Sequence, residues 1–246
     1  QFLGDNGAMI AYTGQLMLES GQTLPIDAAR INPVYRADEV QVTWREEAGT
    51  VRPKTARTEA RGAEAVVSLG EEVVVKRRVG KRYRQPELDR RLIGERTRAE
   101  ARLIAAARKG GVPTPIIQDV TPDTIVMERI YGTLLKEDLK PEFLYAAGKT
   151  VGRLHAAGII HGDLTTGNMI LREGRCVLID FGLAQVSTEL ENRGVDIHVL
   201  FQTLKSTTAD HEILKSAFIQ GYGEEFRACE DVLKREQEIE RRGRYL

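Results

Sequence analysis

Two short segments carry residue types that suit phosphoryl transfer. HGDLTTGN occupies residues 161–168 and IDFG occupies residues 179–182. Asp163 therefore precedes Asn168 by five positions, and Asp180 follows Asn168 by twelve. Transfer of a phosphoryl group from ATP develops negative charge that metal ions must balance, and the acceptor needs a base within reach. Asp163 is the candidate base. Asn168 and Asp180 are the candidate Mg²⁺ ligands, because Mg²⁺ prefers oxygen ligands and takes only one or two carboxylates.

The sequence around these segments predicts a sheet followed by helices. Residues 62–69, 71–79 and 81–84 are extended runs separated by glycines, which favours an antiparallel meander. Strong helix formers fill 86–107, and this helix is expected to end near Lys109. Further expected elements are two strands within 116–130, a helix over 142–157 and mainly helical structure to the end. The expected fold is α+β and bilobal, with an antiparallel sheet plus one helix in the N-lobe and helices in the C-lobe.

Three segments of the chain differ in character. Residues 1–48 contain a mostly apolar helix, AMIAYTGQLML, which is too apolar to stand alone. Residues 49–57 are charged, lack periodicity and contain Pro53, so we predict a linker there. Residues 58–246 hold both chemical segments and are predicted to form the catalytic domain. The chain starts at Gln1 in dense sequence, and we expect it to be part of a longer protein.

The composition of the 246 residues is typical of a soluble globular protein. Apolar residues make up 41%, charged residues 29% and aromatic residues 6%, which excludes collagen-like and low-complexity classes. No apolar run approaches the ~18 residues of a membrane span, and no basic-then-apolar signal opens the chain. Cys176 and Cys229 are isolated, so they support neither a disulfide framework nor a cysteine zinc site. We expect a cytoplasmic protein that does not contact membranes.

Charge is segregated along the chain, although 36 Lys and Arg balance 36 Asp and Glu. Residues 52–109 hold 17 basic against 8 acidic residues, which favours a polyanionic partner over a solvated surface. Residues 234–246 form a second basic segment, whose end is expected to be mobile and able to reach a phosphate backbone. The basic side chains singled out are Lys81, Arg82 and Arg84 at an expected hairpin rim, and Arg241, Arg242 and Arg244 at the C-terminus.

HGDLTTGN followed by IDFG resembles the catalytic loop and the metal-binding DFG of the eukaryotic-like protein kinase superfamily. The resemblance covers residues 58–246 and includes a strand lysine in VVVKRR and a helix glutamate in RAEARL. It implies that Lys76 holds the α- and β-phosphates of ATP and pairs with Glu100. It also implies that His161 supports the catalytic loop and that Phe181 packs in the core between the lobes.

The same resemblance implies the nucleotide contacts. GAEA at 62–65 is a short relative of the Gly-rich loop, and MERI at 127–130 would be the hinge whose backbone reads adenine. The implied cofactors are ATP and Mg²⁺. The residues assigned to nucleotide binding are Gly62, Ala63, Glu64, Lys76, Glu100, Met127, Glu128, Ile130 and Asp180, and those assigned to catalysis are Asp163, Lys76 and Asn168.

Departures from the kinase pattern indicate one branch of that superfamily. HGD replaces HRD, Thr165 stands where many protein kinases have a phosphate-facing lysine, and no APE motif follows DFG. Only 16 positions separate Asp180 from Asp196, which resembles the buried aspartate of the helix after the activation segment. A peptide-docking platform does not fit in that length. Together with GAEA, RAEARL and RRGRYL, this pattern resembles the small atypical RIO-like kinase subunit of the KEOPS complex, which supports threonylcarbamoylation of a tRNA adenosine.

The segment GDNGAMIAYTG resembles the C-terminal signature of the KEOPS threonylcarbamoyl transferase family, which has the ASKHA fold. The resemblance implies that residues 1–48 are the end of such a domain, fused to the kinase as in some archaea. It also implies that Asp5 is a metal ligand, with iron among the candidate metals. The family's metal histidines follow a His-x-x-x-His spacing that the four histidines of this chain lack. The metal site therefore requires the rest of the transferase, and the fragment is expected to be inactive alone.

The expected function is that of an ATP-binding, Mg²⁺-dependent atypical serine/threonine kinase or ATPase that supports threonylcarbamoyladenosine (t6A) modification of tRNA. The expected partners are the transferase, fused or separate, other KEOPS subunits and tRNA. The short segment after Asp180 favours ATP hydrolysis or autophosphorylation over phosphorylation of free proteins. Two alternatives stay open. One is a small-molecule phosphotransferase of the aminoglycoside or choline kinase type, for which the 66 residues after Asp180 are few. The other is a non-catalytic tRNA-binding adaptor, which has no need of a complete metal and base set.

Overall fold

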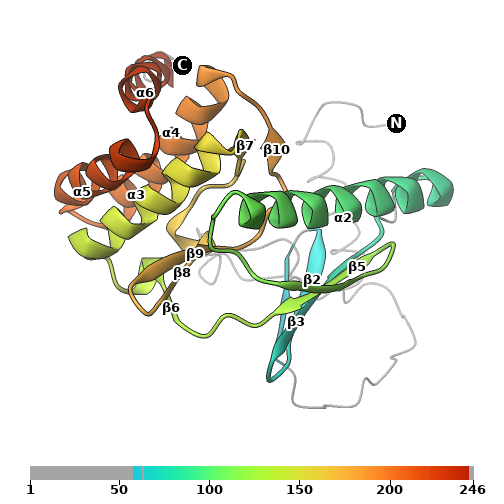
Figure 1. The fold of residues 1–246 in the computed structure, drawn as a ribbon. Coiled ribbons are helices and arrows are strands. Elements are labelled where there is room, and N and C mark those ends of the chain that lie inside the picture. The colour runs from blue at the N-terminus through green and yellow to red at the C-terminus, as the bar shows by residue number, and fades with distance from the viewer. Residues whose placement is uncertain (1–57, 63, 82, 244–246) are drawn as a thin grey trace, which may run out of the picture. The chain divides into compact units, whose positions relative to one another are not determined.

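The computed structural model describes residues 58–62, 64–81 and 83–243. These residues form two lobes, one built on a sheet and one built on helices (Figure 1). The α+β, bilobal architecture predicted from the sequence is confirmed for this part of the chain. The predicted transferase fragment at 1–48 and the linker at 49–57 lie outside the described residues.

The N-lobe is a five-stranded antiparallel sheet in the order β1-β2-β3-β5-β4. Valine and isoleucine dominate its central strands, which suits a pleated, half-buried surface. In the register, Lys76 lies opposite Val67 on one side and Ile125 on the other. The strands are β1 (Thr58–Arg61), β2 (Ala65–Leu69), β3 (Val73–Arg78), β4 (Ile117–Val120) and β5 (Thr124–Glu128).

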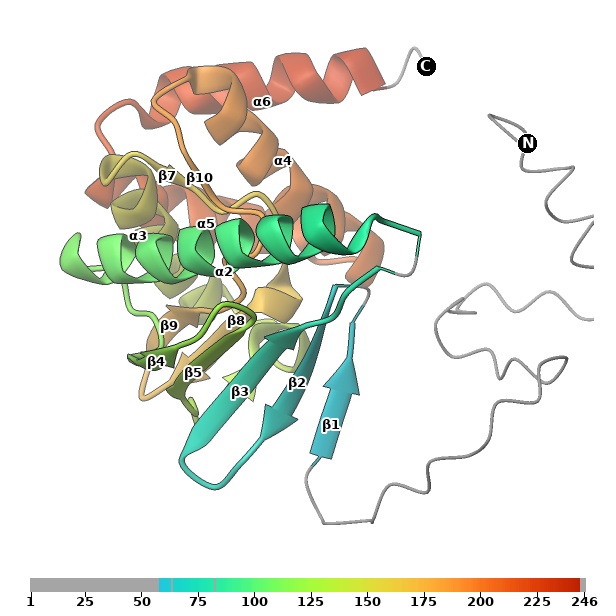
Figure 2. The same cartoon turned by 90° about the vertical axis from the view of Figure 1, so that its right-hand side faces the viewer.

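One long helix, α2 (Pro86–Lys109), lies along this sheet (Figure 2). Proline at its first turn and basic residues at its last turn match the polarity of a helix, and it ends where the sequence predicts. Ala101 of α2 packs on Ile125 of β5. The sequence predicts a strand over 81–84, but the described residues Lys81, Tyr83 and Arg84 are not in a strand, and Tyr83 and Arg84 form a turn and bend that lead into α2. The carboxylate of Asp89 explains the difference, because it accepts the Lys81 N–H at 2.9 Å.

Short strands connect the lobes and carry the chemical segments. The pair β7 (Ile159–Ile160) and β10 (Gln185–Val186) flanks the HGDLTTGN and IDFG segments, and the two strands are antiparallel. A single 3₁₀ turn, η3 (Thr166–Asn168), leads directly into β8. The remaining strands form the sheet β6-β8-β9: β6 (Thr133–Leu134), β8 (Met169–Arg172) and β9 (Arg175–Leu178).

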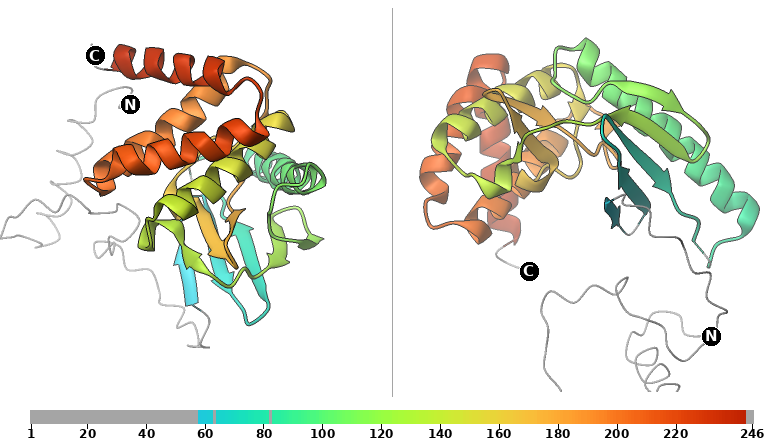
Figure 3. Two further views of the ribbon diagram at one scale, coloured as in Figure 1. Left: turned by 60° about the vertical axis from the view of Figure 1, so that its left-hand side comes forward. Right: turned by 90° about the horizontal axis from the view of Figure 1, so that it is seen from below.

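Four helices make up most of the C-lobe (Figure 3): α3 (Pro141–Ala156), α4 (Leu190–Thr207), α5 (His211–Glu225) and α6 (Cys229–Gly243). The backbones of α3 and α5 approach very closely at Gly148. A Cβ atom built there would lie 2.1 Å from the Phe218 oxygen, so this position requires glycine. The main core lies here and includes Leu154, Phe218 and Tyr222. None of the described helices is long and apolar enough to cross a membrane.

The C-terminal end differs from its sequence-based prediction. Helix α6 continues to Gly243, so Arg241 and Arg242 lie on a helix and not on a mobile end. Arg242 forms an ion pair at 3.1 Å with Glu191 of α4. Arg235 of α6 also pairs with Glu191, at 3.5 Å, so two basic residues of the helix have a structural use. Arg244 lies outside the described residues.

Candidate active site

A cleft of about 340 Å³ lies between the two lobes. Its apolar wall includes Val67, Leu69 and Val74 of the sheet, and its floor includes Ile170 of β8. Most of the residues assigned from the sequence line this one cleft. Those residues are Lys76, Glu100, Met127, Glu128, Ile130, Asn168 and Asp180.

Lys76 is the centre of a charged network in the cleft. Its Nζ lies 2.6 Å from Glu100 Oε1 and 2.6 Å from Asp180 Oδ1. Lys76 and Glu100 are both buried, because the pleat of β3 turns Lys76 inward and α2 places Glu100 against the sheet. Glu100 and Asp180 are 24 and 104 positions away from Lys76 in the chain. The network therefore joins the sheet, α2 and the IDFG segment at one point.

Asp180 is held ionised by its surroundings. Burial raises the pKa of this carboxyl, but the charge of Lys76, its hydrogen bond and the Gly182 N–H outweigh burial, so that the pKa lies below its ordinary value. The Gly182 N–H donates to Oδ1 at 3.2 Å. Asp180 also adopts a left-handed backbone with φ of 59°, which is uncommon outside glycine. Such strain is retained at sites where a side chain must point in one direction.

Asp163 and Asn168 are brought together by the catalytic-loop segment. The Asn168 amide donates from Nδ2 to the backbone oxygen and to Oδ2 of Asp163, each at 2.9 Å. The Thr165 N–H also donates to the Asp163 backbone oxygen, which tightens the turn between them. These bonds fix the direction of the Asp163 carboxylate beside the cleft. Asn168 itself lines the cleft, five residues later in the chain.

The loop is anchored from below by a buried carboxylate. Asp196 of α4 accepts the His161 N–H at 2.6 Å and the Gly162 N–H at 2.8 Å. The His161 ring lies against Phe181, which is buried in the C-lobe core, and its Nε2 lies 3.1 Å from the Ile179 oxygen. Asp196 is buried as expected, and the His161 ring contacts two residues of the IDFG segment. Their contacts make the loop and the IDFG segment one packed unit.

The glycine of HGD has a steric explanation. Gly162 has a φ of 80°, and a Cβ atom there would lie 2.2 Å from the Leu183 oxygen. An L-residue at this position would meet both the left-handed backbone and the neighbouring chain. HGD in place of HRD therefore follows from the close approach of the segment after IDFG.

Arg78 is a member of the network that the sequence analysis missed. Its NH2 donates to Glu100 Oε2 at 2.6 Å, so the two oxygens of Glu100 are shared between Lys76 and Arg78. Arg78 also reaches Glu64 Oε2 at 3.4 Å. The signal was available, because residues two apart on a strand share a face, and Lys76 and Arg78 are two apart on β3.

Glu64 belongs to this network and does not line the cleft. It pairs with Arg96 of α2 at 2.8 Å as well as with Arg78. Partial burial raises the pKa of Glu64, but the hydrogen bond and charge of Arg96, together with Arg78, bring it below its ordinary value. Gly62 forms a tight turn in which its N–H donates to the Ala65 oxygen at 2.9 Å. Ala63 and Asp5, also assigned from the sequence, lie outside the described residues.

The predicted hinge closes the far end of the cleft. The Glu128 N–H donates to the Ile116 oxygen at 2.8 Å, and the Arg129 N–H donates to the Glu72 oxygen at 2.9 Å. The Glu128 carboxylate lies 3.0 Å from Arg172 of β8. These contacts tie the end of β5 to both lobes. The N–H groups of Glu128 and Arg129 thus donate within the protein and are not free for a ligand. Ile130 is the next residue of the hinge, and it lines the cleft.

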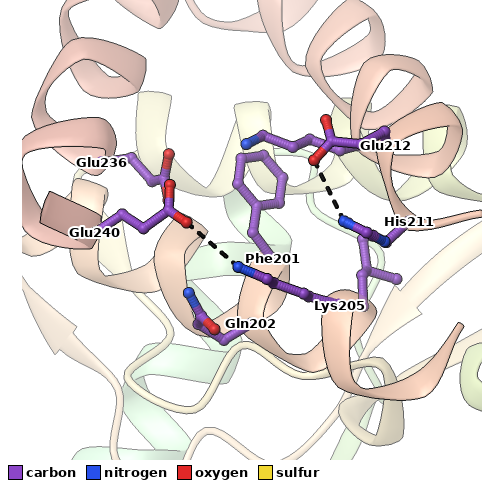
Figure 4. A pocket seen from close by; sticks show the side chains of 9 residues that line it. Phe201, Gln202, Lys205, His211, Glu212, Glu236 and Glu240 are labelled. Atoms are coloured by element: carbon purple, nitrogen blue, oxygen red, sulfur yellow. Dashed lines mark ion pairs between the residues drawn. The ribbon is translucent and has the colours of Figure 1, made fainter. Parts of the chain in front are cut away.

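A second, smaller pocket of about 150 Å³ lies between α4, α5 and α6 (Figure 4). Charged residues line it, and they pair with one another across it. Lys205 lies 3.6 Å from Glu240, and His211 lies 3.3 Å from Glu212. Ligand pockets commonly measure about 300–1,000 Å³, so this space is small for a nucleotide. The interlobe cleft is the candidate active site because it is lined by Lys76, Asn168 and Asp180.

Comparison with known proteins places the domain in a family. Residues 69–197 match the RIO domain, a range that runs from the end of β2 to the middle of α4. The crystal structure of the Rio2 kinase-ADP/Mg²⁺-phosphoaspartate complex from Chaetomium thermophilum has a TM-score of 0.53 to this chain. It covers 76% of this chain and 70% of that chain at 16% identity, and it shares the fold.

Two curated relatives match by sequence. A probable bifunctional tRNA threonylcarbamoyladenosine biosynthesis protein from Methanoculleus marisnigri is 63% identical over all of this chain and 47% of its own length. This chain thus spans about half the length of that relative. A probable serine/threonine-protein kinase BUD32 homolog from Archaeoglobus fulgidus is 50% identical over 75% of this chain and 94% of its own length. The chain therefore belongs to the RIO domain family, and within it to the family of the BUD32 homolog.

Proposed function

We propose that this chain is an ATP-binding, Mg²⁺-dependent atypical kinase or ATPase that supports threonylcarbamoyladenosine modification of tRNA. One observation carries the proposal. Lys76, Glu100 and Asp180 meet within 2.6 Å contacts at one end of an interlobe cleft that Asn168 also lines. Phosphoryl transfer needs a cation, a residue that anchors this cation, and metal ligands around one phosphate group. These residues, although distant in the chain, supply such a set.

The cleft fits Mg²⁺-ATP by shape and by donor chemistry. Its volume of about 340 Å³ and its apolar wall suit a purine base, and its charged end suits phosphates. Asp180 and Asn168 offer a carboxylate and an amide oxygen for Mg²⁺. Among the described residues no cluster of three or more His, Cys, Asp or Glu could hold a metal ion. Mg²⁺ does not need such a cluster, because it keeps waters and takes phosphate oxygens as ligands.

Each residue of the site has a distinct task in this proposal. Bound Mg²⁺-ATP supplies the phosphoryl group and balances its charge. Lys76 binds phosphate oxygens, and Glu100 holds Lys76 at the depth at which it does so. Asp163, oriented by Asn168, accepts the proton of the attacking hydroxyl or water at its carboxylate. The backbone near Ile130 reads the adenine edge.

The short segment after Asp180 supports hydrolysis or autophosphorylation over phosphorylation of free proteins. Val186 of β10 pairs with Ile159 of β7, and α4 begins at Leu190, so the segment is fixed along its length. Asp196 then holds the catalytic loop. Little chain is available to form a groove for a peptide substrate. A water molecule or a residue of the same assembly is the acceptor that needs no such groove.

The tRNA role rests on the names of the relatives and on charge. The relative from Methanoculleus marisnigri is named for tRNA threonylcarbamoyladenosine biosynthesis, and the excess of basic residues in 52–109 suits a polyanion. We propose that the transferase, fused or separate, other KEOPS subunits and tRNA are the partners. Residues 1–48 would be the end of the transferase, inactive alone, and Asp5 would bind a metal such as iron only with the rest of that domain.

An ATPase assay of the full chain tests the proposal. Turnover of Mg²⁺-ATP should rise when the transferase and tRNA are added, and an Asp163→Asn variant should remain inactive under both conditions. Turnover that appears only with small alcohols such as aminoglycosides or choline would favour a small-molecule phosphotransferase instead. Binding of tRNA without any turnover would favour a non-catalytic adaptor. Either result would overturn the proposed function.

A further inference from the structure

Arg78 is a buried cation in the cleft network, and the proposed function does not yet use it. Its side chain is 5% exposed, which is less than that of Lys76. Buried arginines are rare unless they are paired. Arg78 is paired on two sides, at 2.6 Å with Glu100 and at 3.4 Å with Glu64. These two partners belong to different parts of the site.

The Arg78 side chain lies close to the IDFG segment. A Cβ atom built at Gly182 would lie 3.1 Å from Asp180 Oδ1, 3.5 Å from Lys76 Nζ and 3.6 Å from Arg78 NH2. Two cations and the candidate metal ligand therefore surround one backbone position. Two cations so close repel each other unless an anion lies between them, and Glu100 supplies that anion through its two oxygens.

Glu64 connects this cluster to the turn between β1 and β2. The sequence there, GAEA, resembles a short form of the Gly-rich loop of protein kinases. Glu64 is 42% exposed and is held more firmly by Arg96, at 2.8 Å, than by Arg78. An unpaired acidic side chain near bound phosphates would repel them. Arg78 of β3 and Arg96 of α2 both pair with Glu64 and offset its charge.

We propose that Arg78 is a positioning residue for phosphoryl transfer in this cleft, an inference that rests on the proposed function. Its guanidinium links the carboxylate of Glu100 to that of Glu64. It thereby fixes the orientation of Glu100 and, through Glu100, that of Lys76. A planar fork with several donors can bind two carboxylates in fixed directions. The ammonium group of lysine is a point charge and cannot do the same.

The energetics separate this role from a purely structural one. Replacing a buried ionic side chain by an apolar one of similar volume is often neutral for stability, provided that no charge is left alone. When Arg78 is removed, Glu100 still has Lys76 as an ion-pair partner, and Glu64 still has Arg96. In addition, the Arg78 Nε is buried without a hydrogen-bond partner among the described residues. Arg78 is therefore poorly explained by stability alone.

The test compares Arg78→Met with Arg77→Met in the full chain. Arg77 is the matched control, because it is the next residue of β3, is exposed and loses the same charge. Mg²⁺-ATP affinity by titration calorimetry, kcat and KM by ATPase assay, and the melting temperature are measured for both. We expect Arg78→Met to raise KM and lower kcat, each by at least about tenfold, with a melting temperature near that of Arg77→Met. Loss of folded protein alone would lower kcat and leave KM unchanged.

Two more variants keep the inference falsifiable if Arg78→Met does not fold. Arg78→Lys should keep the fold but recover only part of the ATP affinity. Glu64→Gln should raise KM more when Arg78 is present than in an Arg78→Lys variant, because the contact between Glu64 and Arg78 is already weakened in that variant. Equal kinetics of the Arg78 and Arg77 variants, full recovery with lysine, or additive Glu64 and Arg78 effects would each overturn the inference. A wild-type chain that bound no Mg²⁺-ATP would instead overturn the proposed function, and this inference with it.

Discussion

The interlobe cleft and the face between α4 and α6 use the same residue types in opposite ways. In the cleft, Lys76 and Glu100 are at least nine-tenths buried and pair with each other, and Arg78 shares Glu100 with Lys76. On the helical face, Arg242 pairs with Glu191 at 3.1 Å, and both side chains are about half exposed. Water screens the second pair and not the first. We therefore expect removal of a buried, shared charge to change activity and the free energy of unfolding strongly. Removal of an exposed, paired charge should change them little.

The largest effect should follow from substitution of Asp180, which lines the cleft, and of Asp163, which is bonded to the cleft residue Asn168. Asp163→Asn should lower ATP turnover by about 10²–10⁴-fold, because it removes the base while its oxygen still accepts from Asn168. Asp180→Asn should also weaken Mg²⁺-ATP binding, and asparagine tolerates the left-handed backbone there. ATPase assays and titration calorimetry measure the two effects. Wild-type turnover in a folded Asp163→Asn protein would contradict the assignment.

Removal of the shared anion is the next test of the comparison. Glu100→Gln should destabilise the protein by about 3–5 kcal/mol, since it leaves Lys76 and Arg78 as two buried cations that face each other. Lys76→Met should cost less, because Arg78 still neutralises Glu100. Urea unfolding of both variants measures the difference. Equal losses in the free energy of unfolding would contradict the role of Glu100 as the anion that two buried cations share.

Gly162 tests whether the loop owes its shape to close packing. Gly162→Ala should cost about 2 kcal/mol more than Gly158→Ala, because only Gly162 has a neighbouring oxygen at 2.2 Å from the new Cβ. Both glycines have a positive φ, and a Cβ atom at Gly158 has nothing within 4 Å, which makes it the matched control. Thermal unfolding gives the two costs. Equal losses would mean that backbone conformation alone explains the HGD sequence.

His155 should give the stability of the C-lobe a pH dependence. Burial lowers the pKa of His155 below its ordinary 6.5, although Asp196 opposes this shift, so the folded protein keeps it neutral. The unfolded chain binds the proton first as the pH falls. Stability should therefore decline below about pH 6.5, with this residue contributing at most about 1.4 kcal/mol per pH unit. Urea unfolding at several pH values should show a shallower decline in His155→Gln, and an unchanged slope would argue against a neutral His155.

The smallest effect is expected on the helical face. Arg242→Gln should change the free energy of unfolding by less than about 0.5 kcal/mol, because an exposed ion pair contributes little. Thermal unfolding in low and high salt measures it. A loss as large as that of Glu100→Gln would remove the distinction between the two regions.

The sequence predicted what depends on local spacing. Asp163 and Asn168 lie close because one turn of chain separates them, and α2 ends where basic residues and glycines end it. The two-lobed fold follows from the order of strands and helices. The tasks assigned to the individual site residues stay predictions until variants are measured.

What the sequence analysis missed depends on how separate elements pack. Arg78 pairs with Glu100 only because α2 lies on β3 with one particular rotation, which no single segment specifies. Residues 81–84 have strand-like composition, but the carboxylate of Asp89 stabilises a turn there. The C-terminal arginines suggested a mobile end, but α6 includes Arg241 and Arg242, and Arg242 pairs with Glu191, some fifty positions earlier in the chain.

The pinned segment after Asp180 has a consequence for control. Many protein kinases are switched when phosphorylation orders a long, loose loop beside the active site. Here Val186 is paired in a strand and Asp196 holds the catalytic loop, so the intervening chain has few conformations to choose from. Among the described residues, this short segment therefore lacks the freedom that such a switch requires. We expect control to come instead from a partner molecule that covers or uncovers the cleft.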